Sequence, residues 1–137
     1  MEFNAADIFE GVVDRVPDRE AIVHGSTRLT YKELDARSNK AANALNKLGI
    51  KKGSHIGIYA FNCVEWLEIM LGAYKLCAIP ININYRYVEE ELKYLIDNAD
   101  MEAIFYHKQF SNKLENIKSH LPLLKDFICI EDNSGED

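Results

Sequence analysis

Apolar and polar positions form their clearest pattern between residues 54 and 84. An apolar run at 54–60 precedes a long, largely apolar segment, and a second β-branched run follows at 78–84. Short runs of this kind are typical of buried strands, and the middle segment, which is apolar nearly all round, predicts a buried helix. Asn62 is predicted to cap this helix, with Glu65 completing a capping box. Two strands joined by a crossover helix lie parallel in one sheet, so the pattern predicts an α/β fold.

The residues before this unit predict a helix, a β-hairpin and a second helix. Apolar residues recur at helical spacing over 5–16, with Asn4 as the cap. Two extended stretches at 21–24 and 28–31 flank a short turn, as in a hairpin. Thr30 then begins a capping box for a longer helix. The core stripe of that helix is predicted to be Leu34, Ala41, Leu45 and Leu48.

The residues after this unit continue the alternation of helix and strand. Three glutamates open a predicted helix over 89–98, where the helix dipole favours them, and a third parallel strand is predicted at 103–107. Ser111 is predicted to cap a short helix before a fourth strand at 126–130, and residues 131–137 form a polar tail. The whole pattern predicts a three-layer sandwich, with helices on both faces of a mainly parallel sheet, plus the N-terminal helix and hairpin.

Composition narrows the class of partner. A chain of 137 residues is expected to form one domain, and its formal charge of −6 argues against nucleic acid or an anionic membrane as the main partner. No apolar run approaches the roughly 20 residues that span a bilayer. The N-terminus has neither a basic start nor an apolar core, unlike a signal peptide, so we expect a cytoplasmic location.

The cysteines and histidines predict no metal centre. Cys63, Cys77 and Cys129 show no Cys-x-x-Cys spacing, which favours buried, reduced thiols over a reactive or metal-linked role. The four histidines are scattered singly, whereas zinc sites usually contain closely spaced pairs of ligands. We therefore expect no metal ligands in this chain.

The chain has few motifs that carry chemistry, and no catalytic residue is predicted. It has neither a Gly-x-Gly-x-x-Gly fingerprint nor a Walker-type loop, and the Gly25-Ser26-Thr27 turn has no helix N-terminus behind it to bind phosphate. Ligands of parallel sheets bind at the carboxyl ends of the strands, where two loops carry the candidate cofactor-binding residues Asn62 and Arg86. Arg86 offers a fork of donors to an anion, although a surface ion pair with Glu89 or Glu90 is the favoured interpretation. For Asn62 the favoured interpretation is the helix cap.

Five ordered segments resemble the N-terminal signature of the adenylate-forming (AMP-binding) superfamily. They are Leu29-Thr-Tyr-Lys-Glu-Leu-Asp35 with Ser38-Asn39, Ala41-Ala42-x-x-Leu45-x-x-Leu48-Gly-Ile50 with Lys52-Gly53, Asn62-x-x-Glu65-Trp66, Leu71-Gly72-Ala73-x-Lys75, and Ile79-Pro80-x-Asn82. A further stretch, Asn84-Tyr-Arg-Tyr followed by Glu90-Glu91-Leu92, resembles the acyl-CoA synthetase and fatty-acid–CoA ligase branch. Cys77 departs from the family pattern, which commonly has glycine there.

This resemblance implies a two-step ligase in the full-length enzyme. A carboxylate attacks the α-phosphate of Mg-ATP to give an acyl-adenylate and pyrophosphate, and the CoA thiol then displaces AMP. The family segments that perform these steps have no matching position here. We therefore expect residues 1–137 to be an N-terminal fragment of a synthetase, either an excised portion or a truncated descendant, that binds no cofactor and is inactive by itself. Its expected partners are the remainder of the synthetase and a carboxylic (fatty) acid substrate. A homodimer would cover apolar surface or a strand edge left exposed by the missing segments.

Two other classes stay open beside the synthetase. A non-enzymatic module of the same fold would bind a nucleotide or a protein partner through the strand-end loops. An unrelated flavodoxin-like or response-regulator-like domain would need acidic residues at the ends of its early strands, and Ala60-Phe61-Asn62 provides none. A Thr/Ser/Gly-rich loop ending in Pro-Lys, encoded downstream of Asp137, would identify the synthetase.

Overall fold

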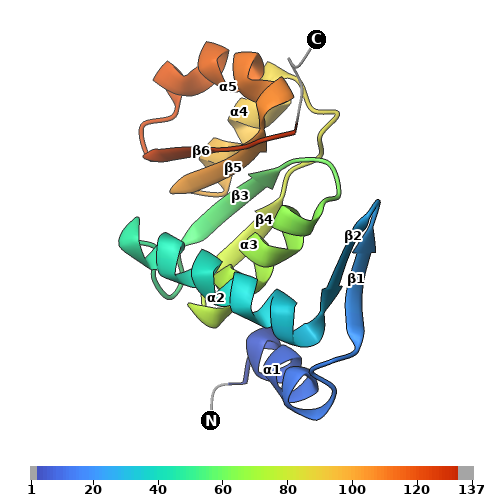
Figure 1. Cartoon of the computed structure of the whole chain (residues 1–137). Helices are drawn as coiled ribbons and strands as arrows, with labels where there is room; N and C mark the ends of the chain where they lie inside the picture. Colours follow the sequence, from blue (N-terminus) through green and yellow to red (C-terminus); the bar gives the residue numbers. More distant parts are fainter. Residues whose placement is uncertain (1–2, 133–137) are drawn as a thin grey trace. The chain divides into compact units, whose positions relative to one another are not determined.

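The computed structural model describes residues 3–132, and the chain divides into two compact units. Of these residues, 3–53 and 63–78 belong to the helical unit, and 54–62 and 79–132 belong to the sheet unit. Figure 1 shows the members of each: three helices with a hairpin in the first, and strands β3 to β6 with two further helices in the second. The strand–helix–strand segment predicted from the sequence therefore contributes its helix to one unit and its strands to the other.

The helical unit contains three helices and one antiparallel hairpin. Its elements are α1 (Ala5–Arg15), β1 (Glu20–His24), β2 (Thr27–Thr30), α2 (Tyr31–Lys47) and α3 (Val64–Lys75). In the hairpin, His24 pairs with Thr27 across a tight turn in which Gly25 has a φ of +59°. The predicted order of helix, hairpin and helix is confirmed, and no residue of α3 is classed as exposed, as expected for a buried helix.

In the helical unit, the caps of α1 and α2 follow the local sequence. Asn4 caps α1 through a hydrogen bond from the Ala6 N–H, and Thr30 and Glu33 form both hydrogen bonds of the capping box of α2. The cap predicted for α3 is wrong. Cys63, not Asn62, is the N-cap residue, and it makes no side-chain cap hydrogen bond. The extended backbone continues through Cys63 (φ −153°, ψ 172°), so Asn62 lies one residue too early to reach the free N–H groups.

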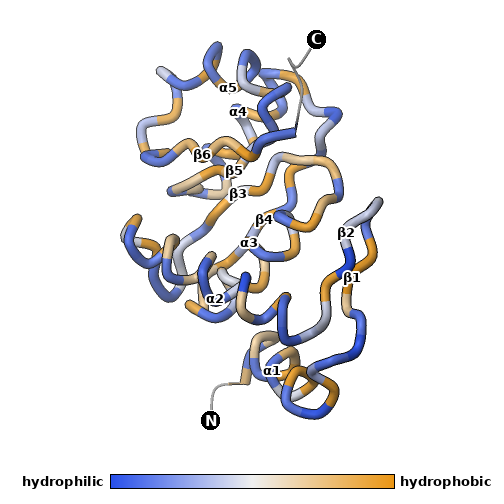
Figure 2. Tube along the Cα trace, in the orientation of Figure 1, coloured by the Kyte–Doolittle hydropathy of each residue, from blue (hydrophilic) through white to orange (hydrophobic). Residues whose placement is uncertain are grey.

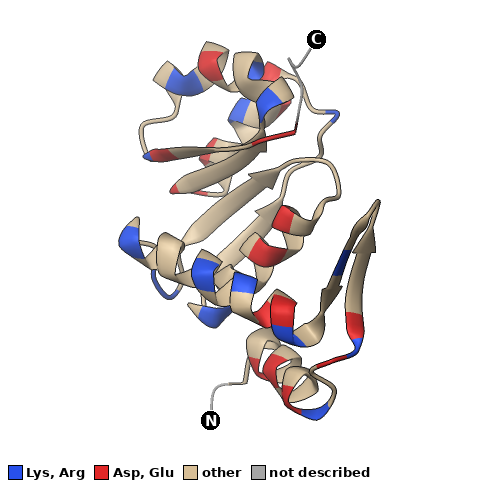
Figure 3. Ribbon diagram, in the orientation of Figure 1, with Lys and Arg blue, Asp and Glu red and all other residues tan. Residues whose placement is uncertain are grey.

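Helices α2 and α3 approach closely at Gly72. A Cβ added to Gly72 would lie 2.9 Å from both the Ala41 Cβ and the Ala42 backbone nitrogen. An ion pair also links the two helices, between Arg37 on α2 and Glu68 on α3. Figure 3 shows basic residues recurring along α2 and acidic residues on α3. The small residue at 72 therefore sets how near the two helix backbones come.

The core of the helical unit differs from the predicted stripe at two positions. Leu34 and Leu45 are buried as predicted, but Ala41 is only half-buried, with Ala42 buried beside it, and Leu48 is 40% exposed. Leu48 is the C-cap residue of α2, where the helix ends, whereas Ile50 in the following turn is 2% exposed. Continuing the helical period to Leu48 was wrong because the chain leaves the helix there. The buried apolar cluster is Ile22, Leu29, Leu34, Val64 and Leu71.

The sheet unit is built on four parallel strands in the order β4-β3-β5-β6. Its elements are β3 (His55–Tyr59), β4 (Ile79–Asn82), α4 (Glu89–Asn98), β5 (Ala103–His107), α5 (Ser111–Ile117) and β6 (Asp126–Ile130), with 3-10 turns η1 (Lys108–Phe110) and η2 (Lys118–His120). Figure 2 shows apolar residues concentrated along these strands. The bounds predicted for α4, β5 and β6 are confirmed, and so is the parallel direction of every strand pair.

One face of the sheet packs with α4 and α5. Gly57 lies opposite Ile81 in β4 and Ile104 in β5, which puts these positions on the same face. The buried cluster on this side consists of Tyr59, Ile83, Leu92, Ile96, Met101, Ile104, Phe110, Leu114, Ile117, Leu121 and Leu124. The α/β class is confirmed, with a parallel sheet flanked by helices, an N-terminal helix and a hairpin.

Two further predictions are corrected by the structure. Ser111 does not cap α5; it is the first helical residue, and its hydroxyl donates backwards to the Lys108 carbonyl. The cysteines are not buried: Cys63 is half-buried, while Cys77 and Cys129 are exposed. Cys77 lies in the turn after α3, and Cys129 lies on β6, an edge strand of the described sheet, so neither position is enclosed.

Candidate functional site

The two loops predicted to carry binding residues contact each other at the carboxyl ends of the strands. Parallel strands end at one edge of the sheet, so the residues that follow β3, β4 and β5 meet there. The Phe61 ring centroid lies 4.6 Å from that of Tyr85, in the loop after β4, and 5.4 Å from that of Phe110. We call Tyr59, Phe61, Tyr85, His107 and Phe110 the strand-end cluster.

His107 fixes the loop after β3. It is the last residue of β5 and is 5% exposed, and its Nδ1 accepts a hydrogen bond of 3.0 Å from the Phe61 N–H. Because Nδ1 is an acceptor here, the neutral imidazole carries its proton on Nε2. Phe61 is consequently held in place with 37% of its surface still open to solvent.

Tyr59 forms the base of the cluster. Its ring stacks on Phe110 with centroids 4.3 Å apart, and its hydroxyl donates a hydrogen bond of 3.1 Å to the Tyr87 carbonyl. Burial, and to a smaller extent the Glu89 carboxylate, raise the pKa of Tyr59 to about 12. A phenol with this pKa keeps its proton at neutral pH, so Tyr59 supports the cluster rather than exchanging protons.

Arg86 lies at the exposed rim of the cluster. Its backbone N–H donates to the Asn84 Oδ1 at 3.0 Å, and its guanidinium lies 5.6 Å from the Tyr85 ring centroid. The predicted ion pair with Glu89 or Glu90 is wrong: within residues 3–132, Arg86 pairs with no carboxylate. Glu89 instead accepts a hydrogen bond from Asn116 on α5. The guanidinium therefore keeps its donors available to a ligand.

Asn62 follows Phe61 and is exposed. Its side chain neither caps α3 nor makes any hydrogen bond to another residue of the described range. No interaction joins it to Arg86, so the structure brings the two loops together without making these two side chains one site. The roles of His107 and of the aromatic contacts were not predicted from the sequence; the signal for them was a histidine that ends a buried strand.

The part of the chain that the structure describes contains neither a metal-binding group of side chains nor an activated thiol. Residues 3–132 hold no group of three or more His, Cys, Asp or Glu side chains placed to bind a metal ion. Burial raises the pKa of the half-buried Cys63 thiol. At the exposed Cys129, partial desolvation and the Glu131 and Asp132 carboxylates raise the pKa of the thiol, so the reactive thiolate is disfavoured at both positions. In the same range, no helix combines the length and apolar character needed to cross a bilayer.

Comparison with known proteins agrees with the sequence resemblance and the fold. A family model described as "AMP-binding enzyme" matches residues 9–136. All of this chain aligns with a 3-oxocholest-4-en-26-oate–CoA ligase of Rhodococcus rhodochrous at 39% identity. It also aligns in full with a medium/long-chain-fatty-acid–CoA/3-oxocholest-4-en-26-oate–CoA ligase of Mycobacterium marinum at 41% identity. In both cases the chain spans 25% of the relative's length.

Solved structures give the same result. The inhibitor-bound N-terminal domain of FACL13 from Mycobacterium tuberculosis matches with a TM-score of 0.90 and 25% identity, covering 94% of this chain and 34% of that one. A crystal structure of an anthranilate–CoA ligase with anthranoyl-AMP also has a TM-score of 0.90, at 26% identity, and covers 93% of this chain and 25% of that one. Since the family model extends over nearly all of the sequence and the fold agrees, this chain belongs to the AMP-binding enzyme family.

Proposed function

We propose that this chain is the N-terminal portion of an AMP-forming acyl-CoA synthetase that acts on a fatty or other apolar carboxylic acid. The observation that supports this most strongly is the alignment of all 137 residues with CoA ligases four times as long, at 39–41% identity. The complete enzyme would join the carboxylate to ATP, releasing pyrophosphate, and would then transfer the acyl group to the CoA thiol, releasing AMP. We also propose a cytoplasmic location for this enzyme.

The described residues do not fit a Mg-triphosphate by themselves. Phosphoryl chemistry needs a metal and preorganised donors at the developing charge. Residues 3–132 contain no acidic metal cluster, and the Gly25-Ser26 turn joins two strands of a hairpin rather than a strand and a helix. We therefore assign ATP, Mg²⁺ and CoA binding to the rest of the synthetase, with the sheet unit as part of its scaffold.

A pyrophosphate exchange assay tests this assignment. The purified chain, incubated with ATP, labelled pyrophosphate and a panel of C8 to C18 fatty acids, should show no exchange above a boiled control. Turnover by the chain alone would contradict the assignment. The reading frame downstream of Asp137 tests the family branch separately, because a synthetase would continue into a Thr/Ser/Gly-rich loop ending in Pro-Lys.

A second candidate function rests on Arg86, whose guanidinium has no carboxylate partner within residues 3–132 and lies over an exposed aromatic ring. A planar guanidinium binds phosphate through paired hydrogen bonds, so the loop after β4 would bind the phosphate of a nucleotide. NMR titration with ATP, AMP and CoA should shift the amides near Asn62 and Arg86. Arg86→Gln should abolish the shifts, whereas the exposed control Arg15→Gln should not. Unshifted amides at both positions would remove this function.

We also propose that the isolated chain self-associates. The hairpin is a two-stranded sheet, so each of its strands has an open edge, and β4 is an edge strand of the four-stranded sheet. Both carry exposed apolar side chains: Val23 on β1 is 56% exposed, and Ile79 on β4 is 45% exposed. Apolar side chains on open strand edges favour pairing between copies, most simply as a symmetric dimer. Sedimentation velocity should reveal a concentration-dependent dimer, and a monomer at all concentrations would refute this proposal.

A further inference from the structure

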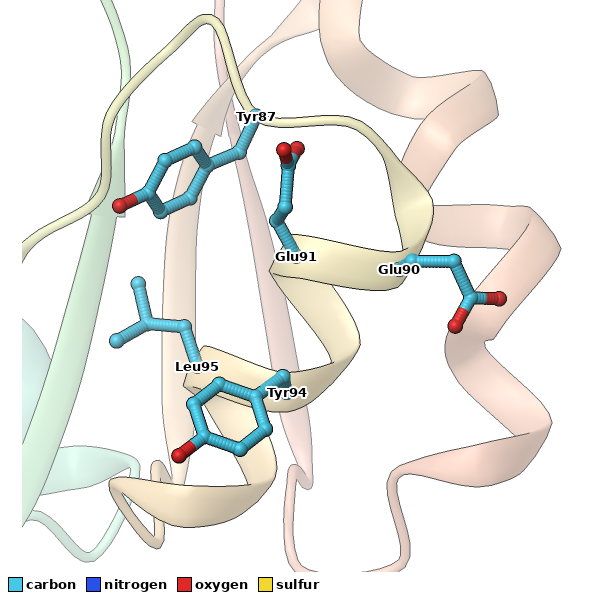
Figure 4. Close-up of a pocket in the computed structure, with 5 residues that line it drawn as sticks. All are labelled: Tyr87, Glu90, Glu91, Tyr94 and Leu95. Carbon is cyan, nitrogen blue, oxygen red and sulfur yellow. The ribbon is translucent and has the colours of Figure 1, made fainter.

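A pocket of about 520 Å³ lies on the exposed side of α4. Its lining residues are Tyr87, Glu90, Glu91, Tyr94 and Leu95. Figure 4 shows Tyr87, Leu95 and Tyr94 projecting to the same side of the helix, with the Glu91 side chain beside Tyr87 and Glu90 on the other side. The pocket therefore has an aromatic and aliphatic wall with an acidic rim, and none of its lining residues is basic.

The polar groups of this pocket are all suited to a cation. Glu91 is held in place, because its Oε2 accepts a hydrogen bond of 2.8 Å from the Val88 N–H. Glu90 makes no hydrogen bond or ion pair to any other described residue. The faces of the Tyr87 and Tyr94 rings attract positive charge, and an aliphatic stem would pack on Leu95. A neutral apolar occupant would instead have to desolvate two carboxylates without supplying a partner.

The charge of the surrounding segment favours the same kind of ligand. Residues 89–102 contain six acidic side chains (Glu89, Glu90, Glu91, Asp97, Asp100 and Glu102) and one basic side chain, Lys93. Two cations lie at the Tyr87 end of the pocket, because Arg86 precedes Tyr87 and the Lys113 Nζ lies 3.4 Å from the Tyr87 carbonyl. Along α4 itself the excess of negative charge raises the local concentration of cations.

The backbone at the pocket is anchored on two sides. The Tyr87 carbonyl accepts hydrogen bonds from the Tyr59 hydroxyl at 3.1 Å and the Lys113 Nζ at 3.4 Å. The opposite face of α4 is anchored by Leu92 and Ile96, which are almost completely buried. These contacts fix the backbone that carries the pocket, which lowers the entropy lost when a ligand binds.

The exposed surface extends beyond the pocket itself. Tyr94 is 72% exposed and Val88 is 48% exposed, which leaves apolar area that a small cation would not cover. From these features we infer that the α4 pocket binds an arginine or lysine side chain presented by a basic segment of another protein. This inference does not depend on the proposed synthetase activity.

Titration of the isotope-labelled chain with an Ac-Ala-Arg-Ala-Arg-Ala peptide tests the inference. Amide shifts should be confined to residues 87–96, and they should weaken as salt is added. Glu90→Gln and Tyr94→Ala should each weaken binding about threefold to fivefold, whereas Tyr94→Phe, which keeps the ring face, should bind like the unmodified chain. Glu115→Gln, an exposed acidic control on α5, should also leave the affinity unchanged.

Three results would overturn the inference. The first is an absence of shifts at 87–96 at millimolar peptide. The second is an equal loss of affinity with Glu115→Gln and Glu90→Gln, which would indicate non-specific charge attraction. The third is binding of methylguanidinium as tight as that of the peptide, which would exclude a polypeptide as the occupant. Circular dichroism of each variant would show that its fold is intact, since the three substituted positions are on the surface.

Discussion

The side-chain amide of Asn4 donates a hydrogen bond of 3.3 Å to the Sγ of Cys77, and so joins the start of α1 to the turn after α3. The Asn4 Oδ1 is occupied separately by the Ala6 N–H. Cys77 has a φ of +57°, in the left-handed region that favours glycine. The bond to sulfur is therefore made by a residue whose backbone conformation is strained.

Glycine at position 77 should be more stable than alanine. Both variants lose the hydrogen bond from Asn4, but Cys77→Gly also removes a left-handed penalty of about 1–2 kcal/mol, about half of which is cancelled by the greater freedom of glycine in the unfolded chain. We expect the free energy of unfolding of Cys77→Gly, measured by urea denaturation, to exceed that of Cys77→Ala by about 0.5–1 kcal/mol. Cys77→Ala is the matched control, because it keeps the strain and loses the hydrogen bond from Asn4. A Cys77→Gly variant less stable than Cys77→Ala would contradict this account.

Gly72 should tolerate no side chain. In Gly72→Ala the new Cβ would lie 2.9 Å from the Ala42 backbone nitrogen, which cannot move without displacing α2. We expect the free energy of unfolding to fall by about 1–3 kcal/mol. Gly11→Ala in α1 is the control: no atom lies within 4 Å of its added Cβ, so alanine should raise stability by up to about 1 kcal/mol. Equal effects at the two positions would argue against a close α2–α3 approach.

Lys75 should stabilise the helical unit through its two carboxylate partners. Its side chain is 8% exposed, and its Nζ lies 2.6 Å from Glu10 and 2.8 Å from Asp35. Lys75→Met leaves the partly buried Asp35 without its cation and should lower the free energy of unfolding by about 2 kcal/mol. Arg28→Met breaks the exposed ion pair with Glu20 and should lower the free energy of unfolding by less than about 1 kcal/mol. Similar losses in the two variants would mean that burial adds nothing to the Lys75 network.

The same network has a defined dependence on pH. Burial lowers the pKa of Lys75, but hydrogen bonds to Asp35 and Glu10 outweigh it, so the pKa in the folded chain is above the ordinary 10.5. A raised pKa means that the stabilisation is fully present below pH 10.5 and is lost as the pH rises through the higher folded value. The stability difference between the unmodified chain and Lys75→Met should therefore be constant from pH 7 to about 10 and shrink above it.

Tyr59 should make the sheet unit sensitive to alkali. Its pKa rises from 10.0 to about 12 on folding, so its contribution to stability is complete below pH 10 and is lost as pH approaches 12. Tyr59→Phe removes the hydrogen bond to the Tyr87 carbonyl, so its free energy of unfolding at neutral pH should be lower by about 1 kcal/mol. It should also lack the part of the decrease in stability above pH 10 that comes from Tyr59. Denaturation between pH 7 and 11.5 measures both effects. The exposed Tyr94→Phe should change neither, and an identical alkaline slope in Tyr59→Phe would exclude Tyr59 as its origin.

His107 should control the mobility of the loop after β3. His107→Ala removes the acceptor of the Phe61 N–H, so hydrogen exchange at that amide should become faster by about tenfold or more. His107→Asn places an amide oxygen close to the position of Nδ1 and should restore most of the protection. Exchange at Ile104, within β5, serves as the internal reference. Unchanged exchange at Phe61 in His107→Ala would show that other contacts hold the loop.

Local signals in the sequence were sufficient for most elements. The capping boxes of α1 and α2, the glutamates that open α4 and the apolar runs of β5 and β6 all act over a few residues, so their positions could be predicted from neighbouring residues alone. The two strand-end loops could also be placed, because the parallel direction of the strands puts them at one edge. The partners of individual side chains in those loops could not.

The sequence by itself determined the α/β class, the order of helices and strands, and the family, since all three depend on short-range periodicity or on ordered motifs. Only the tertiary structure decided that Arg86 lies over Tyr85, that His107 accepts from Phe61, that Leu48 and Cys77 are exposed, and that Cys63 precedes α3. These features depend on backbone dihedral angles at the ends of elements and on contacts between residues far apart in the chain. Neither kind of feature produces a repeating pattern of residues in the sequence, because each depends on a single residue at a single position.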